Sequence, residues 1–431
     1  QMNETNLMSW QFAPKAVACA LAAALLLIAS GCKTSLQKGW TYFEDQNYQK
    51  AYQRWQPAAI EGDARAQFYL ALMYDNGLGV EQNHVEAARW YRHSAEQGFR
   101  FAQNNLGLLY HKGQGVNQDR AEAARWFELA AAQGCDFATA SLGIMHMHGQ
   151  SVEKDLDKAV SLLRRAARDG NAPAMFVLGS MYYDGAGVTQ NYQKAAEWHR
   201  LAADKGYAPA QNTLGLLYER GHGVMKVSAK AIYWYRLAAE QGYAPAMNNL
   251  GLMYLEGKAV QQDFDKAAEY FRLAAKHNIA NAQCALGLMY LNGQRVSQDP
   301  AQAARYLQMA ADKGSPVAQH ALGVMYFEGQ GVAQDFAKAV KWYTVAAEKG
   351  YPEAQNNLAL MYYEGLGVPQ DYAKAIKWLI RAAEQETPQA QYMLGWMYYN
   401  GLGVQQNQEE AARWFKRAVD RGFTLAQPNG L

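Results

Sequence analysis

Apolar and polar residues follow a helical spacing along most of this chain, and the same pattern returns every 36 residues from residue 63 onward. In residues 354–364 (AQNNLALMYYE) the apolar positions recur at intervals of three and four, which is the spacing of one face of an amphipathic helix. A second stretch of this kind follows in each row after a short turn. The pattern therefore predicts two helices per row.

The turn between the two helices shows how regular the rows are. Stepping by 36 from Gly77 returns glycine at every row up to Gly401, and stepping from Val80 returns valine up to Val404. A fixed period of this length is the signature of stacked structural repeats. We therefore predict an all-α solenoid of ten 36-residue helix–turn–helix repeats over residues 63–422.

The residues around each turn agree with this prediction. Glycine directly after the first helix suits a left-handed C-cap. An Asp or Asn precedes the second helix, where its side chain can accept a free backbone N–H. In the fifth row Val227 stands at this position, and we expect Ser228 to replace it. The predicted N-caps are Asn83, Asp119, Asp155, Asn191, Asp263, Asp299, Asp335, Asp371 and Asn407.

Two further columns of the repeat predict how the helices pack. A glycine in the middle of a helix costs about 0.5–1 kcal/mol relative to alanine, so a whole column of them indicates that the second helix crosses there. This column holds Gly107, Gly143, Gly179, Gly215, Gly251, Gly287, Gly323 and Gly395, with Ala71 and Ala359 in the remaining rows. A column of large side chains on the second helix is predicted to form the core: Trp90, Trp126, Trp198, Trp234, Trp342, Trp378 and Trp414.

The pattern A-x-x-x-L-G-x-x-Y-x-x-G-x-G-V-x-x-[DN]-x-x-K-A-x-x-W-x-x-x-A-A-x-x-G resembles the Sel-one-like repeat, a relative of the tetratricopeptide repeat. The resemblance covers residues 63–422, and residues 44–62 supply a preceding half-repeat that we expect to cap the array. It implies a right-handed solenoid. It does not specify a function, because one fold of this kind serves many partners.

Composition narrows the classes of function. Lys+Arg 41 against Asp+Glu 39 gives a net charge of +2 over 431 residues, which argues against a nucleic-acid-binding protein. Four cysteines are too few for a disulfide-stapled scaffold. Cys135 and Cys284 lie four repeats apart, so we expect no bond between them.

Residues 1–31 read as a secretory signal peptide. A single Lys15 precedes the apolar run Ala16–Ile28, whose 13 residues are fewer than the roughly 20 that span a bilayer. The end of this segment, Ala29-Ser30-Gly31-Cys32, resembles the lipobox of bacterial lipoproteins, with Ala29 where the family usually has Leu. The resemblance implies lipidation of Cys32, and Lys33 favours sorting to the outer membrane. Residues 32–43 are then a lipidated cysteine and short linker; ordinary signal cleavage, giving a soluble periplasmic or secreted protein, is the alternative.

The sequence offers little chemistry for catalysis. His146 and His148 are two residues apart and would point to different faces of a helix, so we expect no metal site. The strings Ser35 to Lys38 and Ser151 to Lys154 match S-x-x-K, but the companion motifs of serine β-lactamases are absent from the sequence. We therefore predict a protein that is not an enzyme and has no cofactor.

In the related tetratricopeptide fold the first helix of each pair lines a concave groove. The resemblance places four positions of each first helix on this wall: three before the helical glycine, and one, four and five after it. An amide at the first position could pair with an extended peptide, and large apolar side chains at the fourth-after position usually mark a partner surface. The candidate binding residues are Asn104, Asn212, Asn248 and Asn356 at the first position, and Tyr183, Leu255, Leu291, Phe327, Tyr363 and Tyr399 at the other.

The fifth-after position changes from basic to acidic along the chain, through Lys112, Arg220, Glu256, Glu328 and Glu364. The alternative interpretation of the groove is structural: the asparagines would cap local backbone and the aromatic residues would pack between neighbouring repeats. Both interpretations remain open at this level.

The function that we predict is a monomeric periplasmic scaffold, anchored to the outer membrane, that binds protein partners in its groove. By resemblance, such proteins serve polysaccharide export, envelope assembly, secretion or signalling. The alternative is a protein that binds or hydrolyses peptidoglycan or β-lactams. Residues 423–431 are expected to form a C-terminal tail.

Overall fold

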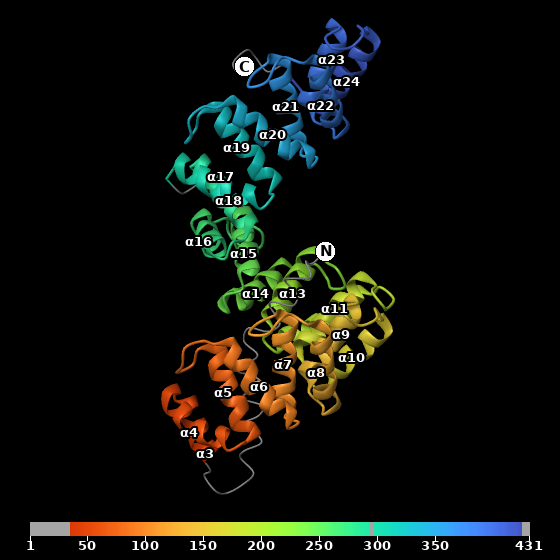
Figure 1. Cartoon of the computed structure of the whole chain (residues 1–431). Coiled ribbons are helices and arrows are strands. Elements are labelled where there is room, and N and C mark those ends of the chain that lie inside the picture. Colours follow the sequence, from red (N-terminus) through yellow and green to blue (C-terminus); the bar gives the residue numbers. More distant parts are fainter. Residues whose placement is uncertain (1–34, 294–296, 425–431) are drawn as a thin grey trace. The chain divides into compact units, whose positions relative to one another are not determined.

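The computed structural model describes residues 35–293 and 297–424, and every regular element within these two ranges is an α-helix (Figure 1). The chain divides after Val227 into two compact units. The helices of unit 1 are α3 (Ser35–Glu44), α4 (Tyr48–Ile60), α5 (Ala64–Asn76), α6 (His84–Glu96), α7 (Arg100–Lys112), α8 (Arg120–Ala132), α9 (Asp136–His148), α10 (Leu156–Arg168), α11 (Ala172–Asp184), α12 (Tyr192–Asp204) and α13 (Ala208–Arg220).

The helices of unit 2 continue the same alternation. They are α14 (Ser228–Glu240), α15 (Ala244–Glu256), α16 (Phe264–Lys276), α17 (Ala280–Asn292), α18 (Pro300–Asp312), α19 (Pro316–Glu328), α20 (Phe336–Glu348), α21 (Pro352–Glu364), α22 (Tyr372–Glu384), α23 (Pro388–Asn400) and α24 (Gln408–Asp420). From α5 onward the odd-numbered helices are the first helices of the repeats and the even-numbered ones the second helices. The all-α solenoid of ten repeats predicted from the sequence is confirmed.

The turn between the two helices follows from its sequence as predicted in the repeats with an Asp or Asn N-cap. The glycine after every first helix has a φ between 64° and 78°, a left-handed conformation that glycine adopts without steric cost. All nine predicted Asp and Asn N-caps accept backbone N–H groups. Asp119, for example, accepts from Ala121 at 3.0 Å and from Glu122 at 2.9 Å. The turns are therefore stabilised within each repeat.

The segment before the first repeat differs from its prediction. Helix α3 occupies most of the region expected to be a linker, and it packs with α4 as a helix pair. Its apolar residues Leu36, Trp40 and Phe43 lie on one face and are buried. Trp55 of α4 is fully buried against them and donates from Nε1 to the Leu36 carbonyl at 3.1 Å. The linker assignment for residues 35–43 was wrong because these apolar residues have helical spacing.

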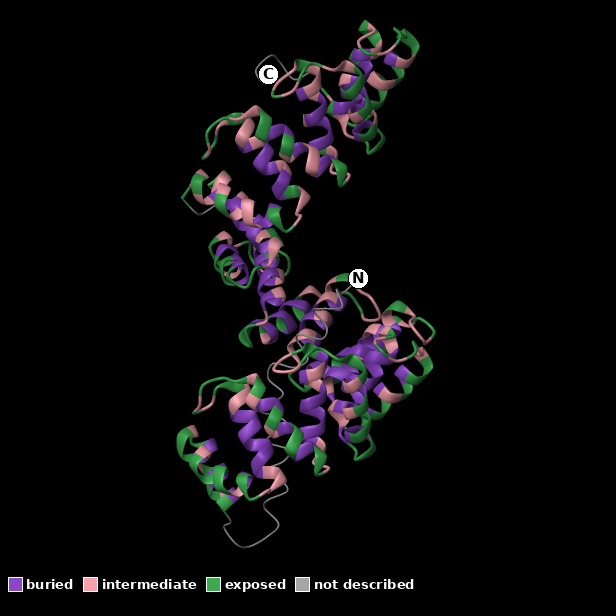
Figure 2. Cartoon of the chain, viewed as in Figure 1, coloured by how far each residue is buried: buried purple, intermediate pink, exposed green. Residues whose placement is uncertain are grey.

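The core lies between the first and second helix of each repeat (Figure 2). The helical glycines face the second helix, as predicted: a methyl group on Gly107 would lie 2.8 Å from the Phe127 ring. The tryptophan column, however, is not this core. Trp126 is half-buried, whereas the next residue, Phe127, is only 1% exposed.

One residue of an α-helix corresponds to a rotation of about 100°, so this shift moves the tryptophans to the edge of the core. Of the seven, only Trp234 is buried. The buried column consists of Tyr91, Phe127, Leu163, His199, Tyr235, Phe271, Leu307, Tyr343 and Leu379. Among the residues that the structure describes, no helix has the length and apolar character of a membrane span.

Candidate functional site

The four predicted groove asparagines lie in the interior of the repeats. Asn104, Asn212, Asn248 and Asn356 are 2%, 6%, 6% and 8% exposed. Rings at the same position show why: Phe176 packs against His199 of its own second helix at 5.2 Å and against Tyr207, just before the next first helix, at 5.6 Å. The position is covered when the next repeat stacks on it. The asparagines therefore do not form the open wall that was expected of them.

Three of these asparagines belong to a hydrogen-bonded pair. The Nδ2 group of Asn104 donates to Oδ1 of Asn105 at 3.0 Å, and Asn105 donates to the Tyr91 hydroxyl at 3.1 Å. Asn248 and Asn356 likewise donate to the following asparagine, at 3.4 Å in each case. The pair joins a buried tyrosine of one repeat to the first helix of the next. The Oδ1 atoms of Asn104, Asn248 and Asn356 are buried and have no hydrogen-bond partner within the described part of the chain.

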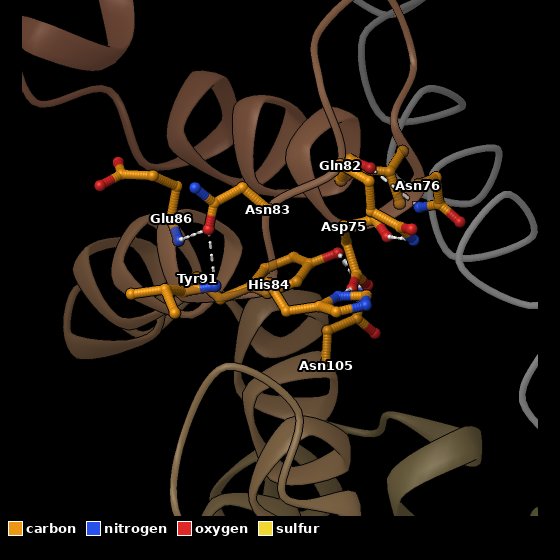
Figure 3. A network of polar contacts seen from close by, with 10 residues as sticks. Asp75, Asn76, Gln82, Asn83, His84, Glu86, Tyr91 and Asn105 are labelled. Carbon is orange, nitrogen blue, oxygen red and sulfur yellow. Dashed lines mark hydrogen bonds and ion pairs between the residues drawn. The ribbon is translucent and has the colours of Figure 1, made fainter.

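In unit 1 this network continues to the half-buried side chains of Asp75 and His84 (Figure 3). The Tyr91 hydroxyl donates to Asp75 Oδ2 at 3.5 Å, and His84 Nδ1 lies 2.9 Å from Asp75 Oδ1. Burial raises the pKa of the Asp75 carboxyl, and the hydrogen bond from His84 opposes that rise. The arrangement connects side chains from Asn104 to His84. It contains one carboxylate, one imidazole, the Tyr91 hydroxyl and the amides of Asn104 and Asn105.

The large side chains at the fourth position after the helical glycine are only half covered. Tyr183, Phe327 and Tyr363 each pack against the first residue of the second helix of the same repeat, with ring centroids 5.0, 5.5 and 5.4 Å apart. In the first repeat Asp75 and His84 occupy the same two positions. Packing is therefore mainly within a repeat, although the Tyr183 hydroxyl also bonds His222 Nδ1 of the next turn at 2.8 Å. Leu255 and Leu291 are half-buried, and Tyr399 is 49% exposed.

In unit 2 this column runs beside a second apolar column, one residue after the helical glycine. Leu252 and Trp396 of the second column are 37% and 40% exposed. Residues three apart on a helix are neighbours on its surface, so the two columns form one continuous feature. We call it the apolar stripe: Leu252, Leu255, Leu288, Leu291, Val324, Phe327, Leu360, Tyr363, Trp396 and Tyr399. The sequence analysis placed both positions on the groove wall but named candidate residues only at the fourth-after one, and it did not identify their continuity within unit 2.

The histidine pair and the two S-x-x-K serines singled out in the sequence do not form a reactive site within the described residues. His146 is buried, and its Nδ1 lies 3.0 Å from the Glu153 carbonyl. No group of three His, Cys, Asp or Glu side chains able to hold a metal occurs among residues 35–293 and 297–424. The Ser35 hydroxyl donates to the Arg54 carbonyl at 2.9 Å, and Ser151 lies in a turn with a φ of 55°.

The cysteines are of two kinds. Cys135 and Cys284 are buried free thiols, and burial raises the pKa of Cys135 to about 11. A thiol with so high a pKa is a poor nucleophile at neutral pH. Cys32, the predicted lipidation site, lies outside the described residues.

Solved structures support the same fold. The chain is 34% identical to a protective antigen of uropathogenic Escherichia coli, c5321, which has an SLR fold; the match covers 90% of this chain and 86% of that one, with a TM-score of 0.71. It is also 34% identical to a Sel1 repeat protein of Oxalobacter formigenes, over 70% of this chain and 88% of that one, with a TM-score of 0.54. No curated protein matches.

The repeat itself is matched ten times. The segments that match the Sel1 repeat are residues 64–99, 100–135, 137–171, 172–207, 208–243, 244–279, 280–315, 316–351, 352–386 and 388–423. They include both the capped turns and the glycine-to-core contacts described above. On this evidence the chain belongs to the Sel1 repeat family.

Proposed function

We propose that this Sel1 repeat chain is a non-catalytic scaffold of the bacterial cell envelope that holds a polypeptide partner against the exposed face of its first helices. The observation that supports the proposal most is the apolar stripe. Its side chains recur on five consecutive first helices, and in four of these repeats the helical glycine already contacts a large core side chain of the second helix. The stripe residues are half-exposed or exposed, and contiguous apolar surface that water can reach marks interaction sites in soluble proteins.

The proposed binding surface differs from the one expected first. The buried asparagines hold neighbouring repeats together, and the half-exposed positions one, four and five after the helical glycine are the ones that a partner can reach. A partner of this surface is a polypeptide, because apolar side chains set at a regular interval suit a chain with its own regular repeat of side chains.

Photocrosslinking in cells tests this binding surface. p-Benzoylphenylalanine introduced at Tyr363 or Tyr399 should give discrete crosslinked products, whereas the same group at Lys377, exposed on a second helix, should give none. Equal crosslinking from all three positions, or none from any, would contradict the proposal. Replacing Phe327, Tyr363 and Tyr399 together by alanine should abolish capture while the far-ultraviolet circular dichroism stays helical.

The proposed location is the periplasmic face of the outer membrane, through lipid on Cys32. The support is the apolar segment followed by the small residues before this cysteine. Metabolic labelling with an alkyne fatty acid should label the wild-type chain and not Cys32→Ala, and this variant should leave the outer-membrane fraction. A label that persists in Cys32→Ala would remove this part of the proposal and leave the binding surface untouched.

A further inference from the structure

The apolar stripe of unit 2 has an acidic border. Glu256, Glu328 and Glu364 stand one residue after the stripe residues Leu255, Phe327 and Tyr363, and all three carboxylates are exposed. Glu256 pairs with Lys258. Glu328 and Glu364 form no ion pair with any residue in the part of the chain that the structure describes. Two of the three charges are therefore available to a partner.

Positive charge is missing from the same helices. The five first helices of unit 2 (α15, α17, α19, α21 and α23) contain no Lys or Arg. The second helices of the unit carry both signs; α20, for example, has Lys338, Lys341 and Glu348. Charge is thus segregated: the first helices that carry the stripe have acidic side chains and no Lys or Arg.

Unit 1 does not repeat this arrangement. Its first helices include Arg65, Arg100, Lys112 and Arg220. At the positions that correspond to the stripe, the polar residues Asp75, His111 and Ser180 interrupt the apolar columns. The combination of a continuous apolar stripe with an acidic border belongs to unit 2.

The repeat spacing matches a helical partner. Packed helices lie about 8–10 Å apart. Successive first helices approach one another at few points, so successive pairs of stripe residues are separated by about that distance or somewhat more. Seven residues of an α-helix rise about 10.5 Å. A helix laid across the first helices would therefore present one heptad to each repeat.

We propose that the apolar stripe of unit 2 binds a basic amphipathic helix of a partner protein. Its apolar face covers the stripe, and its Lys or Arg side chains lie along Glu256, Glu328 and Glu364. This inference rests on the proposed function and specifies the chemistry of the partner.

Three synthetic peptides of about 25 residues test the inference against the full chain. The first has leucine and lysine in a heptad pattern that forms an amphipathic helix, the second has glutamate in place of lysine, and the third alternates leucine and lysine as a strand. In fluorescence anisotropy the helical lysine peptide should bind at least about tenfold more tightly than either of the others. Comparable binding of the glutamate peptide or of the strand peptide would overturn the proposal.

Charge reversal locates the binding site. Glu328→Lys with Glu364→Lys should weaken binding of the helical lysine peptide by about tenfold or more and should let the glutamate peptide bind. The matched control is Glu348→Lys with Glu384→Lys, which makes the same change of net charge on exposed positions of the second helices α20 and α22. Equal weakening by the two double variants would mean that attraction is only to net charge, and would refute the assigned site.

The two proposals fail in different ways. If Tyr363 and Tyr399 still crosslink a partner in cells while the helical lysine peptide does not bind, the basic amphipathic partner is wrong and the binding surface stands. If Tyr363 and Tyr399 crosslink no partner and the helical lysine peptide does not bind, both proposals are wrong.

Discussion

Asn105 donates a hydrogen bond from Nδ2 to the hydroxyl of Tyr91 across 3.1 Å, and so joins the second helix of one repeat to the first helix of the next. Tyr343 and Asn357 stand at the same two positions in unit 2, where Asn357 Nδ2 lies 3.1 Å from His320 Nε2. A tyrosine at this buried position is followed fourteen residues later by asparagine in all three rows that have one; the third pair is Tyr235 and Asn249. Rows with Phe, Leu or His at this position lack that asparagine. The buried hydroxyl and its amide partner therefore occur together.

Replacing Tyr91 by phenylalanine should destabilise unit 1. The variant removes the hydroxyl and leaves the Asn105 amide without that acceptor in a buried place, which costs about 1–3 kcal/mol. Urea unfolding followed by circular dichroism should show the loss as a lower midpoint.

The next junction of the same unit supplies the control. It combines Phe127 with Ala140 and Ser141, so Tyr91→Phe with Asn104→Ala and Asn105→Ser copies a natural junction. This triple variant should regain most of the stability, because both polar partners are then removed. Equal midpoints for the single and triple variants would show that the hydrogen bond contributes nothing.

A methyl group added at Gly107 should clash with the Phe127 ring. The new carbon would lie 2.8 Å from that ring, so Gly107→Ala should cost about 1–3 kcal/mol through overpacking. Adding Phe127→Leu should recover part of the loss, because Ala359 already faces Leu379 in the ninth repeat. A Gly107→Ala chain as stable as wild type would refute the close crossing of the two helices.

Most of the fold could be predicted because each repeat is defined by local signals that recur ten times. The glycine after the first helix and the Asp or Asn before the second act within a few residues, and both were placed correctly. The core column was misplaced by one residue. Trp126 and Phe127 are both large and apolar, and periodicity does not decide which of two adjacent apolar residues faces inward.

The candidate site was harder to predict because its exposure depends on the neighbouring repeat. Asn104 is covered by stacking, which is a non-local contact that no spacing within one row reveals. One signal was present and went unused: glutamine recurs seven residues after the fourth-position residue, and Gln334 Nε2 donates to the Phe327 carbonyl at 2.8 Å. This bond ties the turn to the end of the first helix and helps to fix the stripe residue.

Most turns have a second glycine two residues after the C-cap glycine, as Gly115 follows Gly113. This position should tolerate substitution only in some repeats. Gly115 has a φ of 68°, and a methyl group there would lie 2.0 Å from the His84 carbonyl oxygen of the preceding repeat. Gly115→Ala should therefore cost about 1–3 kcal/mol. Ala259 occupies the corresponding position with a φ of 57°, so Ala259→Gly should leave stability unchanged or raise it by up to about 1 kcal/mol. Thermal unfolding of the two variants distinguishes these effects, and a harmless Gly115→Ala would contradict the close contact.

His199 should make unit 1 sensitive to acid. It fills the core position of its repeat, is 1% exposed, and burial lowers its pKa to about 3. The unfolded chain binds a proton at this histidine below a pKa of about 6.5, while the folded chain keeps it neutral. The stabilisation is therefore complete above about pH 6.5 and is lost as the pH falls toward 3, by about 1.4 kcal/mol per pH unit.

The variant His199→Phe isolates this effect, because Phe127 and Phe271 fill the same position in other repeats. Urea unfolding at pH 7.5 and at pH 4.5 gives the free energy of unfolding of each chain at both pH values. Between these two pH values wild type should lose about 2–3 kcal/mol more of this free energy than the variant. Carboxylates elsewhere titrate alike in both proteins, so the comparison cancels their contribution. If the two chains lose equal stability, His199 is protonated in the folded state and its place in the core must be wrong.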